Sequence, residues 1–118
     1  MNSVKDKQER RRSPRVRRQI PLKIKHDDYD VVGQTHDISS IGAYCTISRH
    51  IPPFSLISII LLLPLRMENK SSICNVRCQG VVVRSQANPQ NSQEFNTAIY
   101  FNRISKSDKA KLLQYVQQ

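Results

Sequence analysis

Alternation of apolar and polar residues predicts a chain built mainly of β-strands. Between residues 20 and 25 every second side chain is isoleucine or leucine, which is the period of a half-buried strand. Pro21 lies among the outward-facing positions of this strand and indicates that it is an edge strand. Apolar periodicity predicts five further strands, at Val31–Ile38, Ala43–Ser48, Leu56–Leu63, Ser72–Ser85 and Phe95–Phe101.

Turn-forming and polar residues predict the connections between these strands. Gly80 interrupts the fifth strand, where a bend or a bulge is expected. The run Leu56–Leu63 is apolar nearly throughout and is expected to be buried on most of its surface. The predicted turns and loops are Asp27–Asp30, Ile51–Pro53, Met67–Ser72 and Asn88–Ser92. Six strands in about 85 residues are typical of a small antiparallel β-barrel.

One α-helix is predicted at the C-terminus, over residues 105–117. Ser105 or Ser107 can cap it, because a serine hydroxyl accepts from the free amides of the first helical turn. The apolar residues of this segment fall at helical spacing and form one stripe, Ala110, Leu112, Leu113 and Val116. We expect this stripe to close an open end of the sheet.

Length and composition fit a single soluble domain. The chain has 118 residues, of which 38% are hydrophobic and 24% charged, enough for one core. We expect residues 1–8 to be a disordered tail and residues 9–117 to form the domain. The apolar run Phe54–Leu63 is too short for a membrane span, which needs about twenty residues. No apolar signal segment is visible at the N-terminus, so we expect a cytoplasmic protein.

The sequence contains no motif that indicates a metal site, a cofactor or an enzymatic activity. Its three cysteines, Cys45, Cys74 and Cys78, lack a CxxC spacing, and its three histidines are scattered. We expect the cysteines to be free thiols in a reducing cytosol. No Ser/His/Asp set, pair of acids or phosphate-binding P-loop is present, so we expect no catalysis.

Positive charge is concentrated at the N-terminus. The net charge is +10, and residues 1–18 hold eight Lys or Arg against two acids, so six of these ten charges lie there. Pro14 disfavours a helix in the Arg10–Arg15 segment and biases Ser13 toward an extended backbone. The arginines therefore form an extended row of planar donors, each suited to phosphate oxygens or to the O6/N7 edge of guanine. An anionic partner is expected.

Two short motifs resemble a known family. The segment Arg11–Arg15 has the form RxxxR, and Asp37–Gly42 has the form DxSxxG about twenty residues later. This pair, followed by β-rich sequence, resembles the PilZ domain, a bacterial receptor for the second messenger cyclic di-GMP. Gly80–Arg84 and Ala98–Phe101 resemble late strands of the family, although a glycine is common where Ala98 stands. The resemblance covers about residues 9–117.

The resemblance implies a site for cyclic di-GMP. Arg11 and Arg15 would contact phosphate and guanine, and Asp37 has the chemistry to accept from guanine N1–H and N2–H₂. An anionic Asp37 beside the arginines favours a guanine ligand over a bare polyanion. Ser39 would add a hydroxyl contact, and Gly42 would let the backbone approach the ligand. The candidate ligand-binding residues are Arg10, Arg11, Arg12, Arg15, Asp37, Ser39, Gly42 and Arg84.

The expected mechanism is a change of order in the basic segment. We expect residues 9–18 to be mobile without cyclic di-GMP and to wrap over it when it binds. In this family the residue before RxxxR is thought to influence stoichiometry, and Arg10 predicts two ligands per chain. The chain has no room for an output domain, so an unidentified effector protein is the expected partner.

Two alternative functions stay open at this point. One is a PilZ-like adaptor that binds proteins and no ligand. The other is a basic β-barrel that binds single-stranded nucleic acid, which the N-terminal charge favours. Four Tyr, three Phe and no Trp leave few stacking platforms, so nucleic acid is the less favoured partner. A nucleic-acid binder would lose affinity steeply with salt and would show no dependence on guanine.

Overall fold

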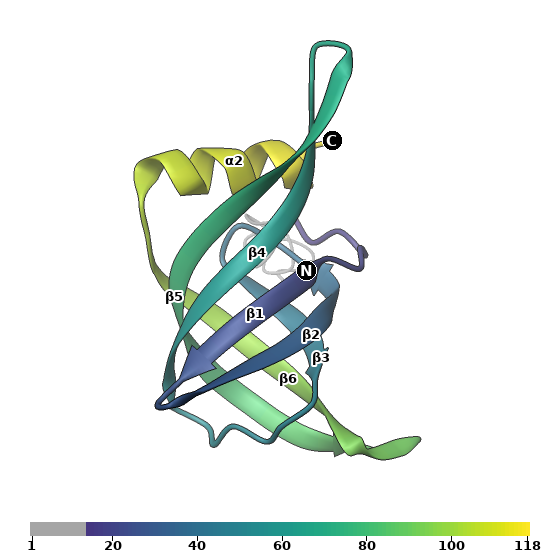
Figure 1. The fold of residues 1–118 in the computed structure, drawn as a ribbon, viewed down its shortest axis with the longest axis vertical. Helices are drawn as coiled ribbons and strands as arrows, with labels where there is room; N and C mark the ends of the chain where they lie inside the picture. Colours follow the sequence, from purple (N-terminus) through teal and green to yellow (C-terminus); the bar gives the residue numbers. More distant parts are fainter. Residues whose placement is uncertain (1–13) are drawn as a thin grey trace, which may run out of the picture.

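The computed structural model describes residues 14–118 (Figure 1). These residues form six strands followed by one helix, as the sequence predicts. The strands are β1 (Pro21–His26), β2 (Tyr29–Ile38), β3 (Gly42–Ile47), β4 (Leu56–Met67), β5 (Lys70–Asn88) and β6 (Asn91–Ile104). The helix is α2 (Lys106–Val116). No helix in this part of the chain is long and apolar enough to cross a membrane.

The six strands close into a ring in the order β1-β2-β3-β6-β5-β4, and every neighbouring pair is antiparallel. The prediction that β1 is an edge strand is wrong, because β1 pairs with β2 on one side and with β4 on the other. Pro21 fits because it is the first residue of β1 and pairs only with Gln34 of β2. The pairing with β4 begins one residue later, at Leu22, so the missing N–H of proline costs no ladder bond there.

Strands β4 and β5 run further than the sequence predicts, and the connection expected at Met67–Ser72 is wrong. Only residues 68 and 69 separate the two strands. Strand β4 also continues through Pro64, which pairs with Ile73 of β5. The pairing of β1 with β4 ends at Leu61, so Pro64 has no second neighbour that requires its N–H. This hairpin projects past the ring (Figure 1), which explains why residues 68–72 at its tip are polar.

The loop expected at Asn88–Ser92 is also mostly strand. β5 ends at Asn88 and β6 begins at Asn91, so the turn consists of residues 89 and 90. The amide of Gln90 donates to the Asn88 side chain over 2.9 Å. A side chain that bonds the backbone two residues on stabilises a tight turn, and the polar composition here reflects that turn rather than a longer loop.

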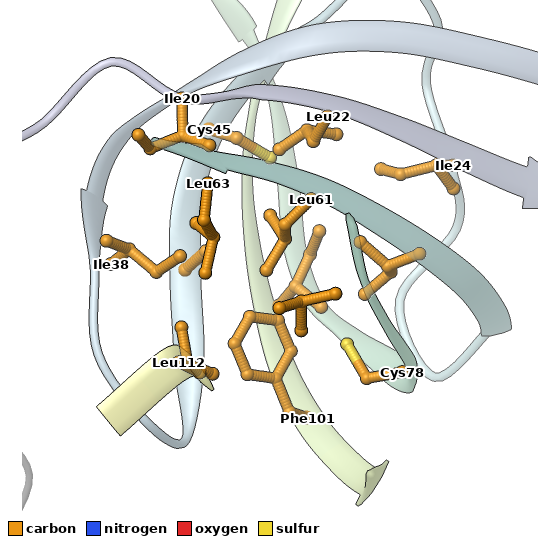
Figure 2. Packing of buried hydrophobic residues seen from close by; sticks show 14 of the residues in the cluster. Ile20, Leu22, Ile24, Ile38, Cys45, Leu61, Leu63, Cys78, Phe101 and Leu112 are labelled. Carbon is orange, nitrogen blue, oxygen red and sulfur yellow. The ribbon is translucent and has the colours of Figure 1, made fainter. Parts of the chain in front are cut away.

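The core fills the inside of the ring (Figure 2). Strand β4 contributes alternate residues, which are Ile57, Ile59, Leu61, Leu63 and Leu65. The expectation that Leu56–Leu63 is buried on most of its surface is wrong at its start, because Leu56 is 70% exposed. The predicted irregularity near Gly80 is confirmed by a register shift between Gln79 and Gly80.

The helix covers one end of the ring. Ser105 caps it by accepting from the amide of Asp108 over 3.1 Å, as predicted. The Asp108 carboxylate in turn accepts from the amide of Arg77 in β5. The predicted stripe is partly wrong, because Leu113 is 37% exposed and Ala110 is exposed, while Tyr115 is buried. The buried residues are Leu112, Tyr115 and Val116, and Leu112 points from the helix toward the core (Figure 2).

Candidate ligand-binding site

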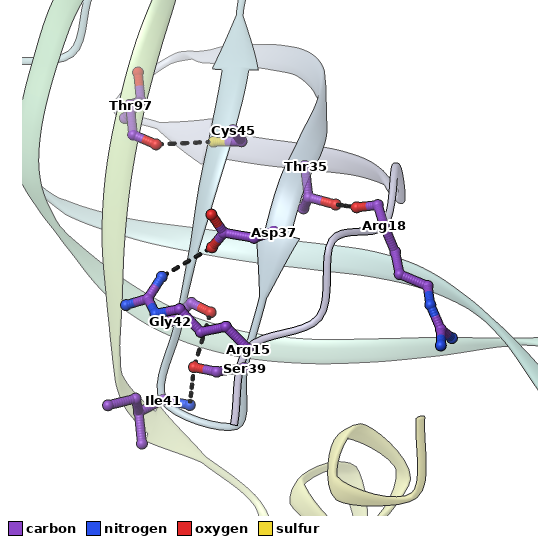
Figure 3. A network of polar contacts seen from close by, with 9 residues as sticks. All are labelled: Arg15, Arg18, Thr35, Asp37, Ser39, Ile41, Gly42, Cys45 and Thr97. Carbon is purple, nitrogen blue, oxygen red and sulfur yellow. Dashed lines mark hydrogen bonds and ion pairs between the residues drawn. The ribbon is translucent and has the colours of Figure 1, made fainter. Parts of the chain in front are cut away.

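The N-terminal segment meets the end of β2 at an ion pair. A guanidinium nitrogen of Arg15 lies 2.9 Å from Oδ1 of Asp37 (Figure 3). Val16 and Ile38 hold the two segments together through a pair of backbone hydrogen bonds of 2.9 and 3.0 Å. The residues after Arg15 are therefore aligned against β2, and one arginine of RxxxR stands beside the aspartate of DxSxxG.

A β-bulge turns Asp37 toward the outside of the ring. Thr35 pairs with Cys45 of β3, whereas Asp37 pairs with Tyr44, so His36 is an extra residue in β2. Thr35 is buried, His36 is exposed and Asp37 is half-buried. A bulge bends its strand and redirects the side chains beside it, and here it places the half-buried Asp37 on the outer face of the ring.

The remainder of DxSxxG builds a tight turn between β2 and β3. The Ser39 hydroxyl accepts from the amide of Ile41 over 3.2 Å and donates to the carbonyl of Gly42 over 3.4 Å (Figure 3). The Ser39 amide also donates to the Gly42 carbonyl. Ser39 is fully buried; its contact with a ligand stays a prediction. Gly42 is needed because a Cβ there would collide with the carbonyl oxygen of Ile99. The glycine thus permits a close approach of β6.

Arg84 lies on the same outer face as Asp37. In the register of the sheet Asp37 pairs with Tyr44, Tyr44 with Ala98 and Ala98 with Arg84. Residues directly opposite each other point to the same face, so these four side chains form one row across β2, β3, β6 and β5. Three strand spacings, roughly 14 Å, separate its two ends. The row gives the site a cation at the end opposite Asp37.

Tyr44 is a site candidate that the sequence reasoning did not name. It lies in the middle of the row, half-buried, with its ring centroid 5.7 Å from that of His36. Its neighbours Ala43 and Cys45 face the core, so strand alternation alone indicates that Tyr44 faces outward. The phenol ring of Tyr44 offers an aromatic surface between Asp37 and Arg84.

Of the four N-terminal arginines predicted to bind the ligand, only Arg15 is among the described residues. Arg10, Arg11 and Arg12 lie outside them, and their roles stay predictions. A second described arginine, Arg18, reaches the other end of the chain. It donates to the carbonyl of Gln118 over 2.9 Å, and its guanidinium lies over the ring of Tyr115. The basic segment therefore contacts both β2 and the C-terminus.

The cysteine below Asp37 is inert. Cys45 is buried, and this burial, together with the nearby charge of Asp37, raises the pKa of its thiol to about 12. Its Sγ donates to the carbonyl of Thr97. In residues 14–118 no group of three or more His, Cys, Asp or Glu side chains is arranged to hold a metal ion.

A closed ring of six antiparallel strands, with a DxSxxG turn after β2 and an arginine docked against its aspartate, defines the class of this domain. The chain belongs to the PilZ domain family, whose model matches residues 9–118. No curated protein gives a sequence match.

Solved structures that share the fold include the following two. One is Bacillus subtilis inhibitor of motility (MotI/DgrA), with a TM-score of 0.75 and 18% identity. The match covers 90% of this chain and 49% of that one, so this chain spans about half of MotI/DgrA. The other is the PilZ domain of YcgR from Escherichia coli, described with c-di-GMP, with a TM-score of 0.62 and 14% identity. That match covers 92% of this chain and 89% of the YcgR domain.

Proposed function

We propose that this protein is a non-catalytic receptor that binds cyclic di-GMP on the outer face of the ring, beside the end of β2. The observation that carries the proposal is the 2.9 Å pairing of Arg15 with Asp37, which brings the two sequence motifs together. Membership of the PilZ family supports this ligand, and the related domain of YcgR is described with it.

The row across the sheet has the chemistry that cyclic di-GMP requires. The carboxylate of Asp37 accepts hydrogen bonds from the N1–H and N2–H₂ groups of a guanine. Arg15 and Arg84 present planar donors to phosphate oxygens or to the O6/N7 edge. Tyr44, between them, offers a ring on which a base can stack. A ligand with two guanines and two phosphates uses all of these groups, whereas a bare polyanion gains nothing from Asp37.

Ligand binding requires the Arg15–Asp37 pair to rearrange. The side chain of Arg15 is 55% exposed and that of Asp37 27%. Exposed ion pairs contribute less than about 1 kcal/mol, so this pair is easily replaced. Guanine donors can take over the carboxylate while the guanidinium turns to phosphate. The ion pair thus holds the site in place at little cost to binding.

We further propose that binding orders the basic segment. Fixing six or seven residues costs about 6–14 kcal/mol, and each charge-assisted bond returns about 1.5–3 kcal/mol, so about four or five such bonds are needed at the middle of these ranges. Val16 is already bonded to Ile38, and we therefore assign the change to the residues before it. Backbone amide relaxation should show order parameters for Arg11 and Arg12 that rise on addition of cyclic di-GMP. High order parameters without ligand would contradict this mechanism but not the site.

Signalling then passes to another molecule. We propose two cyclic di-GMP per chain at saturation and an effector protein that recognises the bound state. The three cysteines are free, which suits a reducing compartment, and we place the protein in the cytoplasm.

Calorimetric titration of single variants tests the site. Arg15→Ala and Asp37→Ala should each weaken cyclic di-GMP binding at least tenfold, because one lost charge-assisted contact is worth about 1.5–3 kcal/mol. Arg66→Ala is the matched control, since Arg66 is an exposed arginine on the projecting β4–β5 hairpin. Unchanged affinity in both site variants would reject the site. No binding by the wild type would favour the ligand-free adaptor instead.

A further inference from the structure

Most of the exposed apolar side chains of β4–β6 and the segment before β4 gather beside the candidate site. Leu56 of β4 pairs with Val81 of β5, and Val81 pairs with Tyr100 of β6, so the three face outward in one row. Val81 is half-buried, and Val83, two residues beyond it, is exposed. The fifth member is Phe54, two residues before the start of β4. We call this set, Phe54, Leu56, Val81, Val83 and Tyr100, the apolar band.

Phe54 is held outward by the backbone. Its side chain is 84% exposed and its φ is 71°, in the left-handed region that bulky residues rarely adopt. The Phe54 amide donates to the carbonyl of Val82 over 2.7 Å, and the Val82 amide donates to that of Ser55. These bonds extend the pairing of β4 with β5 by two residues and fix Phe54 beside the other four members of the band. The band is thus a continuous surface on ordered backbone rather than a set of scattered side chains.

The charges around the band are positive. Arg84 follows Val83 on one side, and Arg103, which pairs with Gln79, borders the other. Strands β4 and β5 contain no Asp or Glu, and the one acid of β6, Glu94, lies six residues from Tyr100 toward the β5–β6 turn. Asp27 shares a shallow pocket with Leu56 but is accompanied there by Lys25.

We infer that the apolar band is a docking surface for a partner protein, which presents an apolar segment flanked by acidic residues. Contiguous exposed apolar patches with a polar rim mark interaction sites, and aromatic residues and arginine are enriched in them. The acidic flanks follow from charge complementarity with Arg84 and Arg103. Three of the five band residues are aliphatic and offer no platform for stacking a base, which favours a protein over nucleic acid.

A peptide library displayed on phage tests the inference, because it presents many combinations of apolar and acidic residues at once. Selection on the full chain, without cyclic di-GMP, should enrich sequences in which Asp or Glu flanks large apolar residues. Synthetic peptides from that selection should lose at least tenfold in affinity for Leu56→Ser and at least threefold for Arg103→Gln. Ile73→Ser and Arg66→Gln are the matched controls, because Ile73 is as exposed as Leu56, at 70%, but lies on the far hairpin. Both controls should bind as the wild type does.

Several outcomes would overturn the inference. These are no enriched sequence, enriched sequences with basic flanks, and binding that is insensitive to Leu56→Ser. Two other results would assign the band to a different occupant if no peptide was enriched. Self-association in sedimentation that Leu56→Ser abolishes would assign the band to a second copy of the chain. Binding to phosphatidylglycerol vesicles that Leu56→Ser abolishes would assign it to a membrane. Leu56→Ser should still bind cyclic di-GMP as the wild type does, so a failure of the receptor proposal is distinguishable from a failure here.

Discussion

The guanidinium of Arg15 and the carboxylate of Asp37 lie 2.9 Å apart although 22 positions separate them in the sequence. Two features bring them together: the backbone pairing of Val16 with Ile38 and the bulge at His36. The pair is partly exposed, so its contribution to folding is small. The pair instead serves to position the two groups: it holds the Arg15 guanidinium, a donor for phosphate, beside the Asp37 carboxylate, an acceptor for guanine.

Replacing Arg15 by lysine should impair binding without unfolding the protein. Arg15→Lys keeps the positive charge but loses the planar fork that bonds phosphate or guanine in two places. We expect at least a tenfold loss of affinity for cyclic di-GMP by calorimetry. Urea denaturation should show a change within about 0.5 kcal/mol, as is usual for surface substitutions. Wild-type affinity in this variant would show that Arg15 acts only through its charge.

Replacing Arg10 by leucine should change the number of ligands bound. Two stacked cyclic di-GMP molecules carry four negative charges, and each close pair repels by about 1–4 kcal/mol before screening. A cation at position 10 offsets part of this repulsion. A calorimetric titration should reach two ligands per wild-type chain and shift toward one for Arg10→Leu. One ligand per chain in both proteins would mean that Arg10 is a solvated residue outside the site.

The two adjacent leucines of α2 should differ sharply in their effect on stability. Leu112 is fully buried against the end of the ring, whereas Leu113 is 37% exposed. Truncating a buried leucine to alanine costs about 2–5 kcal/mol, so Leu112→Ala should lower the free energy of unfolding by that amount. Leu113→Ala, the control, should cost less than about 1 kcal/mol. Equal losses in urea denaturation would contradict the observed orientation of the helix.

Two of the three thiols should be protected from alkylation. Burial, followed by the charge of Asp37 for Cys45 and of Asp108 for Cys78, raises each pKa from 9.0 to about 12. Because the thiolate is the nucleophile, both should react with iodoacetamide at pH 9 at least tenfold more slowly than the half-buried Cys74. In urea all three should react alike. Alkylation is followed by mass spectrometry of the labelled peptides. Equal rates for the three cysteines in the folded protein would contradict the burial of Cys45 and Cys78.

The raised pKa values of Cys45 and Cys78 also predict in which direction the stability of the fold changes with pH. Well below pH 9.0 these thiols are protonated in both states and contribute no pH dependence. Between pH 9.0 and about 12 the unfolded chain releases protons that the folded chain retains, so the contribution of Cys45 and Cys78 to stability falls as pH rises. The double variant Cys45→Ala/Cys78→Ala should show a shallower alkaline loss of stability than the wild type in urea denaturation.

Hydrophobic patterning was sufficient to predict the six strands and the terminal helix, but not where the strands end. Polar residues at Met67–Ser72 suggested a loop because a solvated hairpin has no buried face to impose a period of two. Pro64 suggested the end of a strand because proline has no N–H to donate to a neighbouring strand. A strand can contain it only where no neighbour requires that N–H, and the sequence does not show that β1 stops pairing with β4 at Leu61. That Leu56 is exposed depends on which elements cover the outer face, and alternation does not reveal that.

The candidate site was predictable in its residues rather than in its geometry. The motifs named Arg15 and Asp37, and strand alternation would also have indicated Tyr44. The row that places Arg84 opposite Asp37 depends on the register of four strands and on the bulge at His36. The hydrophobic pattern shows which face of a strand is buried, but which residues pair across four strands also depends on the turns and bulges that form in the folded chain. The turn bonds of Ser39 likewise emerge only in the folded chain.

One comparison tests the central claim most directly: calorimetric titration of the wild-type chain with cyclic di-GMP and, separately, with cyclic di-AMP. The two ligands share their phosphates and ring, but adenine has neither the N1–H nor the N2–H₂ group that Asp37 would accept from. The account predicts saturable binding of cyclic di-GMP and at least a tenfold weaker affinity for cyclic di-AMP, with this difference lost in Asp37→Ala. Equal affinities for the two ligands, or no binding of cyclic di-GMP, would contradict it.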